Sequence, residues 1–169
     1  MKNSGGRRMR RHITWRTWIF GVLSLVWLAM VFGLAGMDGV SSGHLSLRIA
    51  ELVMRFIGRF GAKLETVHHI VRKVAHFGVF AVEGFLVAGT FLTFMRTRCA
   101  LCVTLPLCAV FAVLNEYTQT FAEGRACSPV DMLIDFAGSA LGAAVCAWLF
   151  HIVDRSRRNR RRRKKRKHR

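Results

Sequence analysis

Residues 17–37 read TWIFGVLSLVWLAMVFGLAGM and contain no charged side chain. A helix of about 20 apolar residues crosses the hydrocarbon core of a bilayer, so this stretch is long enough to span a membrane. Three further apolar stretches meet the same condition, and we expect spans at about 74–95, 99–119 and 132–153. In lipid every backbone polar group needs a partner within the segment, which favours helices. The first stretch also suits a signal peptide, although it is longer than a typical signal core.

The charges lie mostly at the two ends of the chain. The sequence carries 27 Lys and Arg against 9 Asp and Glu, for a formal net charge of +18. Residues 1–16 hold 6 basic residues and residues 155–169 hold 12, with no acidic residue in either segment. The formal net charge of residues 17–154 is therefore zero. A neutral apolar body between two cationic ends is typical of a membrane protein. The 5 Cys lie mostly in apolar runs, which argues against a secreted disulfide scaffold.

The basic residues also predict the orientation of the chain. Basic loops stay on the cytoplasmic side, so we expect the arm at 1–16 and the tail at 154–169 to be cytoplasmic, around a membrane domain at 17–153. The connection between the first two spans runs against this rule, because it also carries several Lys and Arg residues. We expect the tail to be disordered and held by anionic lipids of the inner leaflet of the cell membrane. Nucleic acid is not a favoured partner, because no aromatic residues interleave with the basic ones.

Residues 44–60 have apolar side chains at helical spacing, with Arg48, Glu51 and Arg55 on the other face. This pattern predicts an amphipathic helix in the membrane interface, and the alternative is a helix packed on a soluble core. The expected fold is therefore all-α: an integral membrane bundle of four transmembrane helices, with an interfacial helix between the first and the second. The sequence does not predict an oligomeric state.

Polar residues from three segments gather at one membrane level. With both termini inside, the start of the second span, the end of the third and the start of the fourth all reach the outer interface. Charged groups within spans are costly, which makes them functional candidates. The candidate polar cluster consists of Arg72, Lys73, His76, Asn115, Glu116, Gln119, Arg125, Asp131 and Asp135.

Some members of this cluster also have a purely structural interpretation. Ser128 followed by Pro129 suits a helix N-cap with proline at the first helical position, and Asp131 would complement the helix dipole. Arg125 could pair with Glu116 or Asp131 only to neutralise it.

Small residues follow the acidic ones in the fourth span. Asp131 and Asp135 are four residues apart and share a helix face, which Gly138 and Gly142 continue. Small residues on such a face allow another helix to approach closely, so we expect helix packing there.

The sequence does not identify a reaction. His76 with Glu116, Asp131 and Asp135 has the side-chain types of a metal site, but the spacing matches no known metal motif, so we expect neither a metal nor a cofactor. No nucleophile elbow, Walker loop or HExxH motif occurs, which leaves open whether the protein is an enzyme. Glu83, two turns deeper than His76, has no role that the sequence defines.

Two separated motifs resemble the VanZ-like family of small bacterial membrane proteins. Residues 72–80 read RKVAHFGVF, followed by Glu83-Gly84, and resemble the pattern RKxAHFxxY with a Leu-Gly pair. Residues 115–125 read NEYTQTFAEGR and residues 131–138 read DMLIDFAG, and these resemble (D/N)ExxQxFxPGR followed by DxxxDxxG. The chain departs from the pattern at Phe80 for Tyr, Glu83 for Leu and Glu123 for Pro.

The resemblance implies a cell-envelope protein, similar to one linked with low-level resistance to the glycopeptide teicoplanin. The resemblance does not indicate which catalytic activity, if any, the protein has. Three hypotheses follow for the polar cluster: it binds a lipid or cell-wall precursor headgroup at the outer leaflet, it belongs to a transferase or hydrolase of envelope lipids, or it only holds the spans together. In the enzyme hypothesis His76 is a general base with Glu116 or Asp131 as its partner.

Overall fold

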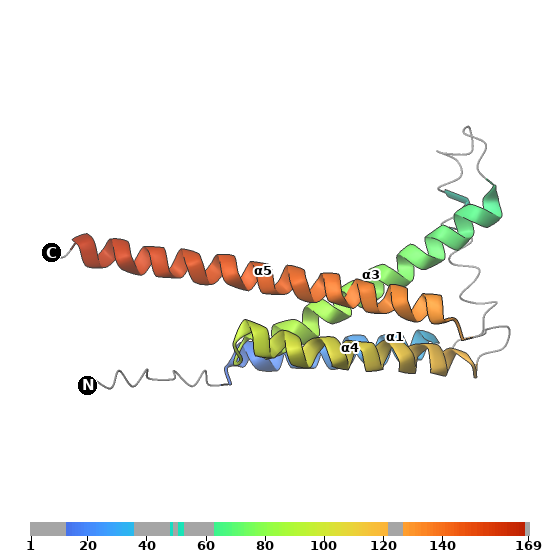
Figure 1. Ribbon diagram of the computed structural model, residues 1–169, viewed down its shortest axis with the longest axis horizontal. Helices are drawn as coiled ribbons and strands as arrows, with labels where there is room; N and C mark the ends of the chain where they lie inside the picture. The colour runs from blue at the N-terminus through green and yellow to red at the C-terminus, as the bar shows by residue number, and fades with distance from the viewer. Residues whose placement is uncertain (1–12, 36–47, 49–50, 53–62, 122–126, 168–169) are drawn as a thin grey trace, which may run out of the picture.

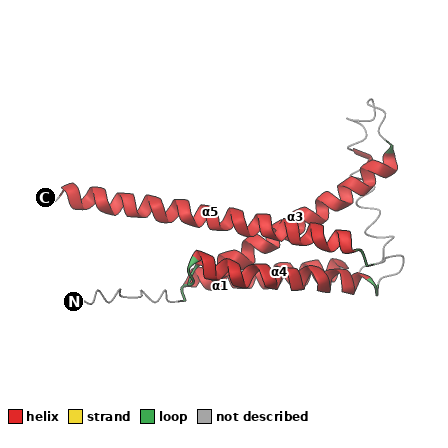
Figure 2. Cartoon of the chain, viewed as in Figure 1, coloured by secondary structure: helices red, strands yellow, loops and turns green. Residues whose placement is uncertain are grey.

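Four helices account for nearly all of the part of the chain that the computed structural model describes, which is residues 13–35, 48, 51–52, 63–121 and 127–167 (Figures 1 and 2). They are α1 (Trp15–Ala35), α3 (Leu64–Leu92), α4 (Thr97–Gln119) and α5 (Pro129–Lys167). Each contains an apolar stretch long enough to cross a membrane, as the sequence predicts. The described residues include no strand. For the described residues, the prediction of an all-helical chain with four helices long and apolar enough to span a membrane is therefore confirmed.

The helices alternate in direction along the long axis of the molecule (Figure 1). The starts of α1 and α4 lie at the end of the bundle from which the C-terminal half of α5 projects, whereas α3 and α5 start toward the opposite end. The predicted interfacial helix at 44–60 lies outside the described residues, apart from Arg48, Glu51 and Leu52, which are helical.

Two helix boundaries differ from the expected ones. Helix α3 begins at Leu64 rather than near residue 74, because Leu64, buried Val67 and Val71 continue an apolar face at helical spacing. Helix α5 continues to Lys167, so the tail that the sequence predicts to be disordered is helical. Arg and Lys are good helix formers, cations complement the C-terminal end of the helix dipole, and propagation of an existing helix needs no new nucleus.

Helices α3 and α5 pack through glycine. A Cβ atom at Gly84 of α3 would overlap the backbone of Ser139, and one at Gly138 or Gly142 of α5 would overlap a backbone carbonyl of α3. Only residues without a side chain allow two helix backbones to approach this closely. The glycine contacts therefore set the distance between α3 and α5, which carry most of the polar cluster.

Helix α4 turns a stripe of small and polar residues inward. Ala100, Thr104, Cys108 and Ala112 recur every four residues and are all buried, and the helix continues unbroken past Pro106. The same face then reaches the polar residues at the end of α4, which are therefore directed toward α3 and α5.

Helix α1 is joined by specific contacts to α3 and to Thr93, the residue that follows it. The hydroxyl groups of Thr17 and Thr93 lie 2.8 Å apart, and the indole N–H of Trp27 donates to the carbonyl oxygen of Val79 at 3.0 Å. These bonds satisfy polar groups that would otherwise face lipid.

Candidate functional site

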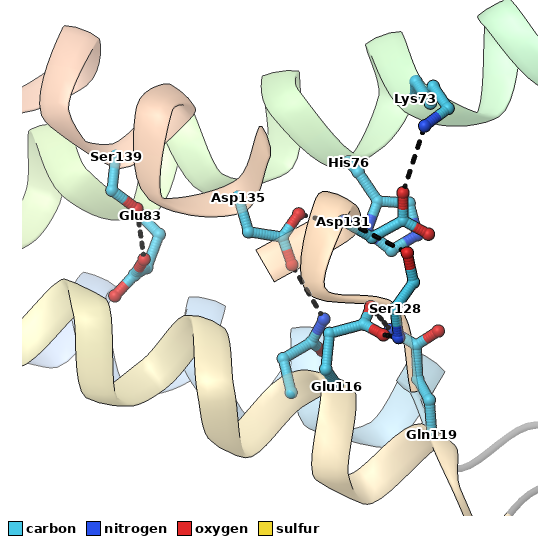
Figure 3. Close-up of polar contacts among 10 residues, drawn as sticks. Lys73, His76, Glu83, Glu116, Gln119, Ser128, Asp131, Asp135 and Ser139 are labelled. Atoms are coloured by element: carbon cyan, nitrogen blue, oxygen red, sulfur yellow. Dashed lines mark hydrogen bonds and ion pairs between the residues drawn. The ribbon is translucent and has the colours of Figure 1, made fainter. Parts of the chain in front are cut away.

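Polar side chains of α3, α4 and α5 meet where α4 ends and α5 begins (Figure 3). In Figure 1 the start of α5 lies at the end of the bundle remote from the C-terminal half of that helix. Residues far apart in the sequence thus lie close together in the structure. We call this set the polar site: Lys73, His76, Asn115, Glu116, Gln119, Ser128, Asp131 and Asp135.

Asp135 is the centre of the first group of hydrogen bonds. Its Oδ1 lies 3.1 Å from Nδ1 of His76, and its Oδ2 accepts a hydrogen bond from Nδ2 of Asn115 at 3.1 Å. The Asp135 side chain is 0% exposed and the His76 side chain 19%. Three helices therefore contribute one residue each to a bonded chain that runs from the interior toward the surface.

Glu116 is the centre of the second group. Its Oε1 accepts a hydrogen bond from Nε2 of Gln119 at 3.1 Å, and its Oε2 accepts one from the backbone N–H of Ser128 at 3.0 Å. The first contact follows from the spacing of three residues along α4. The second joins α4 to the start of α5, so Glu116 fixes the position of the chain where α5 begins.

Lys73 and Asp131 form the exposed rim of the site. Nζ of Lys73 lies 3.4 Å from Oδ1 of Asp131, and their side chains are 42% and 20% exposed. The backbone N–H of Asp131 donates to Oγ of Ser128 at 3.3 Å, so Ser128 caps α5 as its sequence position before Pro129 indicates. Asp131 thus takes part in the N-terminal cap of α5 through its backbone and in an ion pair with Lys73 through its side chain.

The remaining predicted residues take different positions. Arg72 is partly buried on α3 and makes no hydrogen bond or ion pair with another described residue. Arg125 lies outside the described residues. Gly138 and Gly142 lie on the face of α5 that packs against α3, one and two turns beyond Asp135.

A second polar contact lies deeper in the bundle. Oγ of Ser139 donates to Oε2 of Glu83 at 3.1 Å, and both residues are fully buried (Figure 3). The other carboxylate oxygen, Oε1, has no hydrogen-bond partner among the described residues. The sequence indicated that Glu83 lies deep in the span. It gave no signal for Ser139 as the partner, because that pairing depends on how α5 is rotated against α3.

One subset of the polar site has the composition of a metal site. A nitrogen of His76 and one oxygen each of Glu116 and Asp135 lie within 4.8 Å of one another. Imidazole and carboxylate are common ligands of transition-metal cations. The sequence spacing does not reveal this subset, since its members come from three helices.

Four apolar helices around a buried polar site define a multi-pass helical membrane protein. The chain belongs to the VanZ/LLP1 family, whose profile matches residues 20–151. The match begins within α1, extends into α5 and includes every residue of the polar site. Comparison with curated proteins and with solved structures gave no match.

Proposed function

We propose that this protein binds the phosphate-bearing headgroup of a lipid or cell-wall precursor at the outer leaflet of the cell membrane, and thereby contributes to glycopeptide tolerance, including tolerance of teicoplanin. The observation that supports this most is the position of Lys73. Its ammonium group lies at the rim of a buried hydrogen-bonded site, with the side chain 42% exposed.

The contacts of Lys73 leave it capacity for a ligand. An ammonium group has three N–H donors, and the bond to Asp131 uses one of them. Asp131 holds the side chain at the rim, so less conformational entropy is lost when a phosphate binds. Arg72 on the same helix adds a second cation, and guanidinium groups bind phosphate through two parallel hydrogen bonds.

The carboxylates of the site favour a ligand with more than a phosphate. Glu116, Asp131 and Asp135 outnumber the basic side chains with which they are bonded, Lys73 and His76. A simple phosphate would be repelled by this excess of negative charge. A headgroup that also presents sugar hydroxyls or an amine could donate hydrogen bonds to the partly exposed carboxylate of Asp131. Cell-wall precursors carry phosphate, hydroxyl and amine groups together.

The direction of the helices supports an outer-leaflet position. The start of α1 and the cationic C-terminal half of α5 lie at one end of the bundle, and the end of α4 and the start of α5, which contribute to the polar site, lie at the other (Figure 1). Basic segments favour the cytoplasmic side, so the polar site faces outward. Glycopeptides act on precursors displayed at that leaflet, which connects headgroup binding with tolerance.

Lipid that copurifies with the protein tests headgroup binding. Lys73→Gln should reduce the anionic lipid recovered by mass spectrometry. Lys63→Gln is the matched control, because it removes a cation from the residue that precedes α3, outside the polar site. Equal lipid recovery from both variants and the wild type would refute the proposal.

Antibiotic susceptibility tests the proposed consequence. A sensitive Gram-positive host expressing the wild-type chain should tolerate more teicoplanin than a host expressing Asp131→Asn at the same membrane level. If both chains raise the tolerated teicoplanin concentration equally, or neither raises it, the link between the polar site and tolerance is refuted. Headgroup binding is then tested only by the lipid that copurifies.

The pair of His76 and Asp135 favours a second candidate function, a transferase or hydrolase of envelope lipids. A carboxylate bonded to Nδ1 orients an imidazole for general base catalysis. The residue in contact with His76 is Asp135, rather than the expected Glu116 or Asp131. Incubation with envelope lipid extracts should then give a product that His76→Gln does not form, and identical lipid profiles would exclude the activity in that extract.

A further inference from the structure

We infer that His76, Glu116 and Asp135 bind a divalent transition-metal cation such as Zn²⁺. One residue comes from each of α3, α4 and α5, and the three ligand atoms lie within 4.8 Å of one another. Zinc bonds of about 2.0–2.2 Å to nitrogen and oxygen place tetrahedral ligand atoms roughly 3.4 Å apart. The three side chains therefore need only small rotations to share one cation, and the fourth position stays open.

The charge of the buried carboxylates provides an independent argument. Glu116 is 1% exposed and Asp135 is 0% exposed. The two hydrogen bonds to the Glu116 carboxylate come from neutral donors, the amide of Gln119 and the backbone of Ser128. Among the described residues, no Lys or Arg forms an ion pair with either carboxylate. Buried charges need compensation, and one divalent cation neutralises both groups.

The surrounding hydrogen bonds resemble the outer shell of a metal site. Asn115 donates to Asp135, while Gln119 and the Ser128 backbone donate to Glu116. In metalloproteins such bonds fix the orientation of ligating carboxylates and contribute to affinity. Among the described residues these contacts involve no Lys or Arg, and they hold both carboxylates near His76.

The donor types favour a particular class of cation. One imidazole nitrogen with two carboxylate oxygens suits Zn²⁺ and its neighbours in the transition series, whereas Ca²⁺ and Mg²⁺ prefer sites made only of oxygen. A cation here would also counter the excess negative charge of the polar site. Metal binding does not depend on the proposed headgroup.

Co²⁺ is a suitable probe for this site in the full chain. The protein is purified, placed in neutral-lipid nanodiscs, stripped with a chelator and titrated with Co²⁺, and Zn²⁺ is then added to displace it. Cobalt spectra distinguish nitrogen and oxygen ligands from thiolates, which matters because Cys99, Cys102 and Cys127 are exposed. We expect about one equivalent of Co²⁺ with a spectrum that lacks thiolate charge-transfer bands.

Three variants separate the site from other metal binding. Glu116→Gln and Asp135→Asn keep side-chain shape and should each weaken Co²⁺ binding at least tenfold. Thr118→Ala is the matched control, because Thr118 lies two residues from Glu116 and its hydroxyl group donates to the Leu114 carbonyl of its own helix. Size-exclusion profiles confirm that each variant is folded.

Either of two results would overturn the inference. In the first, the wild type does not bind about one equivalent of Co²⁺ with a spectrum typical of nitrogen and oxygen ligands. In the second, both carboxylate variants bind Co²⁺ with unchanged affinity. A wild-type spectrum dominated by thiolate bands belongs to the first result. The titration uses no anionic lipid, so metal binding and headgroup binding are tested separately. Co²⁺ binding can be absent while Lys73→Gln still reduces lipid recovery, and Co²⁺ can bind while Lys73→Gln has no effect.

Discussion

Replacing Gly84 by alanine tests the close approach of α3 and α5. A Cβ atom at this position would lie 2.6 Å from the Cα of Ser139 and closer still to its carbonyl oxygen. Carbon atoms in contact sit about 3.5–4.0 Å apart, so the helices would have to separate by about 1 Å. The obstacle is backbone rather than a flexible side chain, and it cannot rotate away.

The size of the effect follows from a comparison within α3. Gly78→Ala is the matched control, because nothing lies within 4 Å of the added atom. Both substitutions gain about 1 kcal/mol of helix propensity. Gly84→Ala also introduces overpacking at the upper end of the usual range, about 3 kcal/mol. We therefore expect Gly84→Ala to lose about 2 kcal/mol and Gly78→Ala to gain about 1 kcal/mol, which separates their unfolding midpoints by about 6–12 °C.

Buried cysteines provide the assay. Cys108 and Cys146 are 0% exposed, so a thiol-reactive dye reports unfolding once the exposed Cys99, Cys102 and Cys127 are replaced by serine. Thermal scans in the same detergent compare the two alanine variants. Equal midpoints, or a lower midpoint for Gly78→Ala, would refute the glycine-mediated contact.

Three further predictions concern other parts of the chain. Glu83→Leu combined with Ser139→Ala removes both partners of a buried hydrogen bond, together with a carboxylate oxygen that has no described partner, so the pair of changes should raise stability by about 1–3 kcal/mol in the same scan, and a loss would reveal an ionic role. Trp27→Phe removes a hydrogen bond between α1 and α3 and should lower stability by about 0.6–1.7 kcal/mol, while Trp18→Phe, on an exposed side chain, should not. In intact cells a membrane-impermeant maleimide should label a single-cysteine chain at Cys127 but not at Cys99, and the opposite pattern would invert the orientation.

The sequence predicted the elements better than their contacts. Apolar length alone identifies four spans, because the thickness of a bilayer fixes the number of residues needed. The contact of Gln119 with Glu116 follows from helical periodicity, and the cap at Ser128 follows from local chemistry. These features depend on neighbours within a few residues, so one sequence is enough to predict them.

The pairings between helices could not be predicted in the same way. Asp135 contacts His76 and Asn115, and Lys73 contacts Asp131, because of how three helices are rotated about their axes. Between α3 and α5 the glycine contacts constrain that rotation, and it depends on both helices together rather than on any single segment. The helical tail was missed for a different reason, since a run of like charges is typical of disorder unless a helix already precedes it.

The length of α5 has a mechanical consequence. The helix is uninterrupted from Pro129 to Lys167, at 39 residues or about 58 Å, whereas its membrane-length stretch ends at Ser156 (Figure 1). Asp131 and Asp135 are near one end of this rod, and the cationic segment forms the other. Because the helix is continuous, a force that tilts or pulls its cationic end would also move the first turns of α5, which carry Asp131 and Asp135.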